Sequence, residues 1–182
     1  MERIIRRIDS ISEFVGKTAV WVIIPLTFAL GYEVFSRYLF SAPTTWAFDL
    51  SITLYGAYFM LASAYALRRN AHVRGDIFYR NFPQRTQAII DLTLYILVFF
   101  PAMLALMYMG TSYFWASFRI RETSAFSPYA RPIYPLKAAI PLSAFFLLLQ
   151  GVAQSLRCII AIRTGRWHDQ EKVRPEEAEA VA

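Results

Sequence analysis

Three ionisable residues lie within or beside the most apolar parts of this chain, and they are the first candidates for chemistry. Glu33 and Arg37 are four residues apart, a spacing that places both side chains on one face of a helix. Asp49 follows after a short uncharged connection, at a similar distance from the expected turn. We therefore predict a Glu33–Arg37–Asp49 ion cluster that joins two helices into a hairpin. A coupling-ion or substrate site and a contact with a partner subunit are alternative interpretations.

Histidine and cysteine are scarce, which limits catalytic and metal chemistry. The chain has two histidines, His72 and His168, and one cysteine, Cys158. A single cysteine excludes an intramolecular disulfide and a cysteine-based metal site, and neither histidine lies in an apolar run where it could ligate a membrane haem. The loop with His72, Arg74 and Asp76 offers too few ligands for a metal. We predict no enzymatic activity and no cofactor.

A basic and aromatic segment between residues 118 and 135 is a candidate contact with another protein, with a plain solvated loop as the alternative. Its charged candidates are Arg119, Arg121, Glu122 and Arg131. Two tryptophans, Trp46 and Trp115, fall near the ends of apolar runs. Since amphipathic rings gather at membrane–water interfaces, we expect these two to be interface residues.

The composition indicates the elements that must position these residues. Hydrophobic residues make up 57% of the 182 positions and charged residues only 18%, against about 45–50% and about 25% in soluble domains. The mean hydropathy is +0.36. These values exclude a disordered chain and argue against nucleic acid as a partner, despite a net charge of +6. They favour a protein whose partners include phospholipid.

Four long stretches without Asp, Glu, Lys or Arg decide the fold class. Residues 92–118 form a run of 27, residues 138–156 a run of 19, residues 50–67 a run of 18 and residues 18–32 a run of 15. About 20 apolar residues suffice for a spanning helix. We predict an all-α integral membrane protein with spans at 18–39, 46–67, 89–116 and 135–157. A soluble helical bundle is disfavoured, because a helix of 27 uncharged residues has no polar face for water.

Prolines and chain ends refine this picture. Pro25 and Pro101 lie inside spans and are expected to kink them, whereas Pro135 and Pro141 lie in the opening turns of the fourth span. The four spans belong to one domain, residues 1–167. The charged and proline-containing end, residues 168–182, is expected to be a disordered cytoplasmic tail.

Two amphipathic segments are expected outside the spans. Near the N-terminus, apolar residues recur at helical spacing, which predicts an interfacial helix before the first span. These residues are Ile4, Ile8, Ile11 and Val15. Between the second and third spans, a short segment with apolar and basic residues is expected to lie on the membrane surface. It includes Ile77, Phe78 and Phe82, with Arg80 and Arg85.

The basic residues predict the orientation. Fourteen of the Lys and Arg residues fall in the two termini and the loop at 68–88, whereas the loop at 119–137 has four and the loop at 40–45 has none. Because cytoplasmic loops are enriched in Lys and Arg, we predict that both termini lie in the cytoplasm.

Several ordered motifs resemble those of one transporter family. The run Glu33-Val-Phe-Ser-Arg37-Tyr-Leu-Phe40 with Pro43, Trp46 and the acid at 49 is similar to the first hairpin of the small, Q-type (DctQ-like) membrane subunit of tripartite ATP-independent periplasmic (TRAP) transporters. The loop His72-Val-Arg74-Gly-Asp76 resembles the same family's cytoplasmic loop. Later motifs, Glu122-Thr-Ser124 and Tyr134-Pro135-Leu-Lys137, resemble the branch associated with mannitol or chloroaromatic acids. Position 49 departs from the family's usual Glu, and Gly75 replaces a common apolar residue.

The resemblance implies a function that composition alone does not. It implies an accessory subunit in the bacterial inner membrane, with a large permease subunit and a periplasmic solute-binding protein as partners. Together they would import organic acids, typically carboxylates, driven by a sodium gradient. The small subunit would brace the permease and help dock the binding protein. The alternative from another class is a stand-alone dimeric exporter of four helices per chain, coupled to protons through Glu33.

Overall fold

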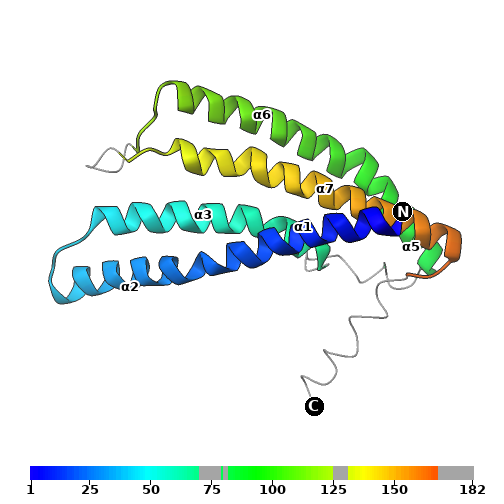
Figure 1. Cartoon of the computed structure of the whole chain (residues 1–182), viewed down its shortest axis with the longest axis horizontal. Coiled ribbons are helices and arrows are strands. Elements are labelled where there is room, and N and C mark those ends of the chain that lie inside the picture. Colours follow the sequence, from blue (N-terminus) through cyan, green and yellow to red (C-terminus); the bar gives the residue numbers. More distant parts are fainter. Residues whose placement is uncertain (70–78, 80–81, 125–130, 168–182) are drawn as a thin grey trace, which may run out of the picture.

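The computed structural model describes residues 1–69, 79, 82–124 and 131–167, and nearly all of them are helical (Figure 1). The helices are α1 (Glu2–Trp21), α2 (Ile23–Leu39), α3 (Thr45–Arg68), α5 (Gln84–Leu94), the π-helical segment η1 (Tyr95–Phe99), α6 (Phe100–Arg119) and α7 (Tyr134–Thr164).

The predicted all-α membrane fold is confirmed by four helices long and apolar enough to cross a membrane. They are Glu2–Leu39, Thr45–Arg68, Gln84–Arg119 and Tyr134–Thr164. Each contains one predicted span. The first and third are longer than predicted, because α1 continues into α2 and α5 continues through η1 into α6. The fourth is longer because α7 continues to Thr164.

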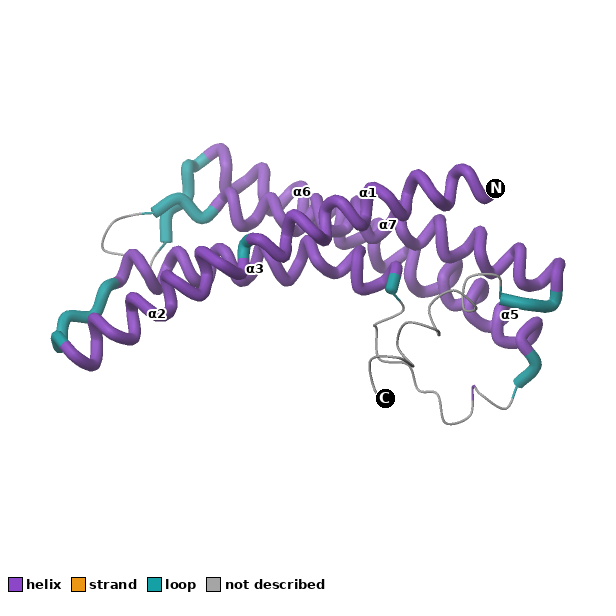
Figure 2. Tube along the Cα trace, turned by 60° about the horizontal axis from the view of Figure 1, so that its bottom comes forward, coloured by secondary structure: helices purple, strands orange, loops and turns teal. Residues whose placement is uncertain are grey.

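Helix α7 is the centre of the bundle. It packs against α6, α3, α5 and α1, whereas α2 packs on α3 and forms only a small contact with α1. The α2–α3 turn and the α6–α7 connection lie at the same end of the molecule, which we call the hairpin end (Figure 1). The two hairpins diverge toward this end in both views, and α5 and the N-terminus lie at the opposite end (Figures 1 and 2).

Small residues make up most of the buried interior. The fully or nearly fully buried apolar residues are mostly alanines: Ala19, Ala29, Ala47, Ala64, Ala88, Ala139, Ala144, Ala153 and Ala161. At Gly16 a Cβ atom would lie 2.5 Å from Cβ of Tyr65, and at Gly151 it would lie 2.4 Å from Cε1 of Phe99. In lipid there is little hydrophobic drive between helices, so close backbone approach and dispersion hold them together.

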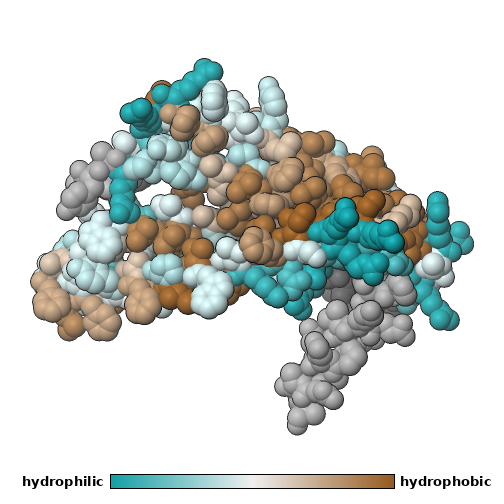
Figure 3. All heavy atoms as spheres, viewed as in Figure 1, coloured by the Kyte–Doolittle hydropathy of each residue, from teal (hydrophilic) through white to brown (hydrophobic). Residues whose placement is uncertain are grey.

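Large apolar side chains point outward instead. Phe28, Tyr38 and Tyr108 are each more than three-quarters exposed. Figure 3 shows hydrophobic side chains over the middle of the visible face, with strongly hydrophilic ones near the N-terminal end and at the upper left. This distribution suits a surface that meets lipid or another membrane protein.

The expected interfacial N-terminal helix is present as a helix, but it packs into the bundle. Its inward face consists of Ile5, Ser12, Gly16 and Ala19, and it contacts α3 and α7. The predicted apolar stripe is turned outward in part, since Ile4 and Ile11 are exposed. Beside this inward face, Asp9 and Glu13 form ion pairs with residues of α7 and α3, as described below.

Two of the four prolines coincide with helix irregularities. Helix α1 gives way to α2 at Val22, three residues before Pro25, whose missing N–H cannot bond the carbonyl of Trp21. The π-helical segment η1 ends two residues before Pro101. Pro135 lies in the first turn of α7 as expected, and Pro141 lies inside that helix.

Two expected segments lie largely outside the described residues. They are the interfacial segment, of which Ile77, Phe78 and Arg80 are not described, and the C-terminal tail at 168–182. Phe82 is described and is exposed, and the amide of Gln87 donates a hydrogen bond to its carbonyl at 2.9 Å.

The two glycines of the first long helix offer a matched test of close packing. In Gly16→Ala the new methyl group meets the stem of Tyr65, which cannot move without its backbone, so we expect a loss of about 1–3 kcal/mol in unfolding free energy. Gly31 has open space around its Cβ position. Gly31→Ala should therefore cost nothing and can add up to about 1 kcal/mol. Thermal unfolding of the purified chain in detergent measures both, and equal effects would contradict the packing described here.

Candidate functional site

The buried carboxylate of Glu33 organises the hairpin end of α2 and α3. The residue is 5% exposed. Its Oε1 atom accepts hydrogen bonds from Nε and Nη2 of Arg37, at 3.0 and 2.5 Å. Its Oε2 atom accepts one from the backbone N–H of Thr44 at 2.8 Å and another from the Thr44 hydroxyl. One carboxylate therefore joins a cation on its own helix to the residue at which α3 begins.

The local sequence explains this geometry. The turn after α2 closes through Ser36 and Ala42, which exchange two hydrogen bonds, and Ser41 adopts a left-handed backbone conformation with φ of 50°. Thr44 is the N-cap of α3 but makes no side-chain bond to its own helix. Its hydroxyl donates a hydrogen bond to Glu33 instead. This contact also brings the negative charge of Glu33 to the start of α3, where the helix dipole favours a negative charge.

Asp49 does not join this cluster. No ion pair connects it with Arg37 among the described residues, and the buried Oδ2 atom of Asp49 has no hydrogen-bond partner. The predicted three-residue cluster is thus present only as the Glu33–Arg37 pair. The reason is that Arg37 turns back along its own helix, and that Thr44, not Asp49, supplies the contact from the second helix.

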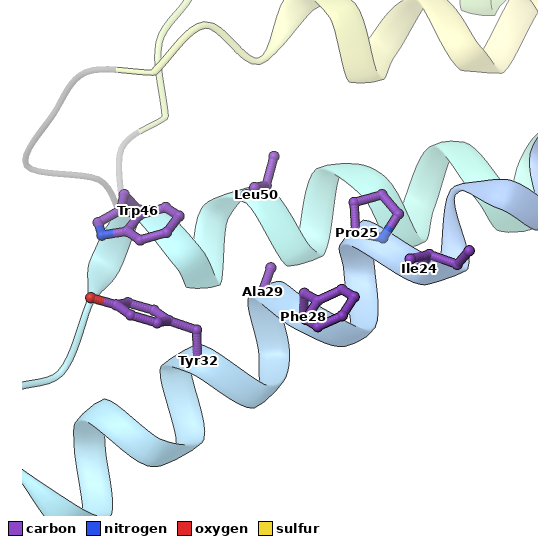
Figure 4. Close-up of a pocket in the computed structure, with 7 residues that line it drawn as sticks. All are labelled: Ile24, Pro25, Phe28, Ala29, Tyr32, Trp46 and Leu50. Atoms are coloured by element: carbon purple, nitrogen blue, oxygen red, sulfur yellow. The ribbon is translucent and has the colours of Figure 1, made fainter.

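An open apolar groove runs along the α2–α3 hairpin (Figure 4). Pro25, Phe28 and Tyr32 line it from α2, and Trp46 and Leu50 line it from α3. The rings of Tyr32 and Trp46 lie 5.3 Å apart, centre to centre. The predicted interface residue Trp46 therefore stands at the hairpin end of this groove, and it is partly exposed.

The connection between α6 and α7 is held in a defined shape. Helix α6 ends in a Schellman arrangement, in which the N–H groups of Arg121 and Glu122 bond the carbonyls of Phe118 and Ser117. Arg121 takes the left-handed position, with φ of 49°. A short antiparallel bridge between Thr123 and Pro132 then joins the two sides of the connection.

A buried lysine fixes this connection to the bundle. Lys137 is 8% exposed, forms an ion pair with Glu122 and places its ammonium 4.0 Å from the ring centre of Tyr113. This cation–π contact and the carboxylate compensate for the burial of the charge. The predicted contact residue Glu122 thus has a partner within the chain.

The three arginines of the candidate contact differ in exposure. Arg119 and Arg121 are exposed, and the guanidinium of Arg119 lies over the ring of Trp115 at 5.6 Å. Arg131 is half-buried, and its carbonyl accepts a hydrogen bond from the N–H of Ser124. Trp115 is half exposed near the end of α6.

The family-motif residues His72, Arg74 and Asp76 lie outside the described residues. The described part of the chain holds no group of metal-ligating residues.

A polar network at the N-terminal end was missed by the sequence analysis. Asp9 on α1 pairs with Arg157 on α7 at 2.5 Å, and Glu13 pairs with Arg68 on α3 at 2.9 Å. Between them, the fully buried Gln150 accepts a hydrogen bond from Ser12 at 2.7 Å and donates one to Asp9 at 3.1 Å. Three helices are therefore joined by charges and amides inside the bundle.

The signal for this network is present in the sequence. Asp9 and Glu13 are four residues apart on the polar face of the N-terminal helix, and Gln150, Gln154 and Arg157 recur at a four–three spacing on the fourth span. Such a polar stripe in an apolar helix indicates contact with another polar helix face.

The contact between Glu122 and Lys137 makes stability depend on pH. The hydrogen bond from Lys137 is the main cause that holds the pKa of Glu122 below its ordinary value of 4.5. Because the folded-state pKa is the lower one, the contact stabilises the fold fully above that ordinary value and is lost as the pH falls through the folded-state pKa. We expect Glu122→Gln to lower the melting temperature at neutral pH, and the difference from the unaltered chain to shrink in acid.

The exposed residue Glu2 provides the control for this experiment. Its only ion pair is a 3.9 Å contact with the exposed Arg6 among the described residues, so Glu2→Gln should leave the melting temperature nearly unchanged at every pH. A Glu122→Gln difference that stays constant into acid would contradict the assignment.

Comparison with known proteins identifies the family. Residues 26–161 match the DctQ family, described as the DctQ component of tripartite ATP-independent periplasmic transporters. No curated protein matches significantly over this sequence. The matched region contains the Glu33–Arg37–Thr44 contact, the Glu122–Lys137 pair and the α7 half of the polar network. Since the match covers most of the chain, the protein belongs to the DctQ family, the small membrane subunits of TRAP transporters.

Proposed function

We propose that this chain is the accessory subunit of a sodium-driven importer of organic acids, typically carboxylates, in the bacterial inner membrane. It braces the large permease subunit and helps dock the periplasmic binding protein. The family match carries the proposal. The likeness to the mannitol or chloroaromatic-acid branch stays a prediction from the motifs alone.

The use of charge within the bundle supports an accessory role. Glu33, Lys137 and Asp9 each bond to partners on the same chain. These contacts join helices to each other, as expected of groups that hold a shape. A substrate or ion pathway would instead need polar groups that line an open route at mid-membrane.

The alternative exporter would depend on Glu33. A proton carrier must be able to release its partners in each cycle, whereas Glu33 is buried with Arg37 and Thr44 both bonded to it. This geometry supports a structural role, and we prefer the accessory subunit.

The basic connection after α6 is the surface we assign to the binding protein. Arg119 and Arg121 are exposed at the hairpin end, and the Schellman turn and the Thr123–Pro132 bridge hold the backbone around them. A fixed pair of exposed cations suits an acidic face on a soluble partner and steers its approach.

Charge reversal at this surface tests the proposed docking. In liposomes that contain this chain, its copurified large permease and a sodium gradient, uptake of a labelled carboxylate should require the binding protein. The double variant Arg119→Glu and Arg121→Glu should raise the half-saturating concentration of binding protein about tenfold or more at low salt, with maximal uptake unchanged. Arg163→Glu on α7 at the opposite end is the matched control and should leave the half-saturating concentration unchanged.

Each result bears on a separate part of the proposal. Uptake without a sodium gradient would contradict sodium coupling. Equal half-saturating concentrations for the double variant and the control would remove the connection after α6 from the docking surface. Carboxylate uptake by this chain without the permease would overturn the accessory role itself.

The proposed orientation places the hairpin end in the periplasm. We expect a membrane-impermeant maleimide to label Ala42→Cys in intact cells, whereas Glu2→Cys should react only after the membrane is opened. Both positions are exposed, and the native Cys158 is buried at 2% exposure and should stay unlabelled. The reverse pattern would show the opposite orientation.

A further inference from the structure

The hairpin end of α2 and α3 presents a surface that the described residues of the chain leave uncovered. Helix α2 packs on α3 and barely on the rest of the bundle, and the hairpins diverge here (Figure 1). Phe35, Tyr38 and Phe40 are each about two-thirds exposed or more. The open groove along α2 and α3, which has Tyr32 and Trp46 at its hairpin end, adds a concave apolar site to this surface (Figure 4).

Asp49 is the one carboxylate at this end that lacks a partner among the described residues. Glu33 bonds to Arg37 and Thr44, and Glu122 bonds to Lys137. Asp49, in the second turn of α3, is half-buried, and its Oδ2 atom is buried without a donor. A carboxylate in such a place costs free energy unless a cation or hydrogen-bond donor reaches it.

The position of Asp49 on its helix indicates where a cation would come from. Asp49 and Gly56 are seven residues apart, so they lie on the same face of α3. At Gly56 that face packs on Leu136, in the first turn of α7. Asp49 lies two turns closer to the hairpin end than Gly56 does, whereas α7 begins at Tyr134, only two residues before Leu136. Helix α7 therefore does not extend far enough to cover Asp49. This face of α3 therefore continues past the helix that covers it.

We propose that Asp49 accepts a lysine or arginine side chain from the large permease subunit, which packs against the hairpin end of α2 and α3. The inference rests on the proposed function, since it takes the permease as the partner. Charge complementarity identifies the occupant: an apolar, aromatic surface with one unpaired carboxylate fits a membrane helix that carries one basic residue. Such an ion pair contributes more binding free energy at a desolvated interface than at an exposed one.

The experiment compares the complex with the purified chain. Asp49→Asn removes the charge and keeps the shape, and Asp49→Glu keeps the charge. We expect Asp49→Asn to weaken retention of the permease about tenfold or more in detergent washes, and Asp49→Glu to retain it. In the purified chain alone, Asp49→Asn should leave the melting temperature unchanged or raise it, because none of the described residues donates a hydrogen bond to its buried Oδ2 atom.

Glu33→Gln is the matched control at the same end. Since Glu33 is bonded within the chain, this variant should lower the melting temperature of the purified chain, which Asp49→Asn should not do. With Asp49 kept, a photo-crosslinking residue in place of the exposed Ile52, three residues further along α3, should capture the permease. The same residue in place of Leu97, on the exposed face of η1, should capture it much less.

Two results would overturn the inference. The first is full retention of the permease by Asp49→Asn, and if bound phosphatidylethanolamine is lost at the same time, the carboxylate belongs to a lipid amine. The second is a lower melting temperature for that variant in the purified chain. If the unaltered chain itself fails to retain a permease, the proposed function falls together with this inference. Loss of retention confined to Asp49→Asn supports it.

Discussion

Close approach between helix backbones is the constraint on which this structure depends. In a bilayer, apolar side chains gain little by leaving lipid for protein, so helices associate where small residues let their backbones touch. At Gly16 and Gly151 the missing side chain leaves room for the side chains of Tyr65 and Phe99, and the buried apolar interior is largely alanine. Large side chains are left on the outside as a consequence. The interior of the bundle therefore consists mostly of small residues and its outer surface of large ones. Such a surface suits a subunit that packs against a larger membrane protein.

Polar contacts at the two ends of the bundle supply what small residues cannot, namely a defined register. Glu33 ties the end of α2 to the start of α3 through Thr44, and Lys137 ties α7 to the connection after α6 through Glu122. At the other end Asp9, Gln150 and Arg157 join α1 to α7. Hydrogen bonds and ion pairs have strict distances, so they fix how far one helix slides along another. These contacts give the small subunit a defined shape.

The membrane spans could be predicted from sequence because water-soluble helices need charged or polar residues on one face, and the charge-free runs of 15–27 residues lack them. The Glu33–Arg37 pair could be predicted because a helix places residues four apart on one face. The contact of Glu33 with Thr44 could not, because it depends on the shape of a turn. Asp49 was expected to join them, but Arg37 had a nearer carboxylate on its own helix. The network around Gln150 depends on which face of α1 turns inward, and the apolar stripe lies on a neighbouring face of that helix.

The continuity of α1 and α2 has a mechanical consequence. Residues 2–39 form one nearly unbroken rod, about 57 Å long at 1.5 Å per residue. Asp9 lies close to one end of it and Glu33 close to the other, so the rod carries an attachment point on each side of the bilayer. The interruption at Val22, just before Pro25, is the place where it can flex. A tilt of this long helix on one side of the bilayer therefore displaces its end on the other side, and bending at Val22 reduces that displacement.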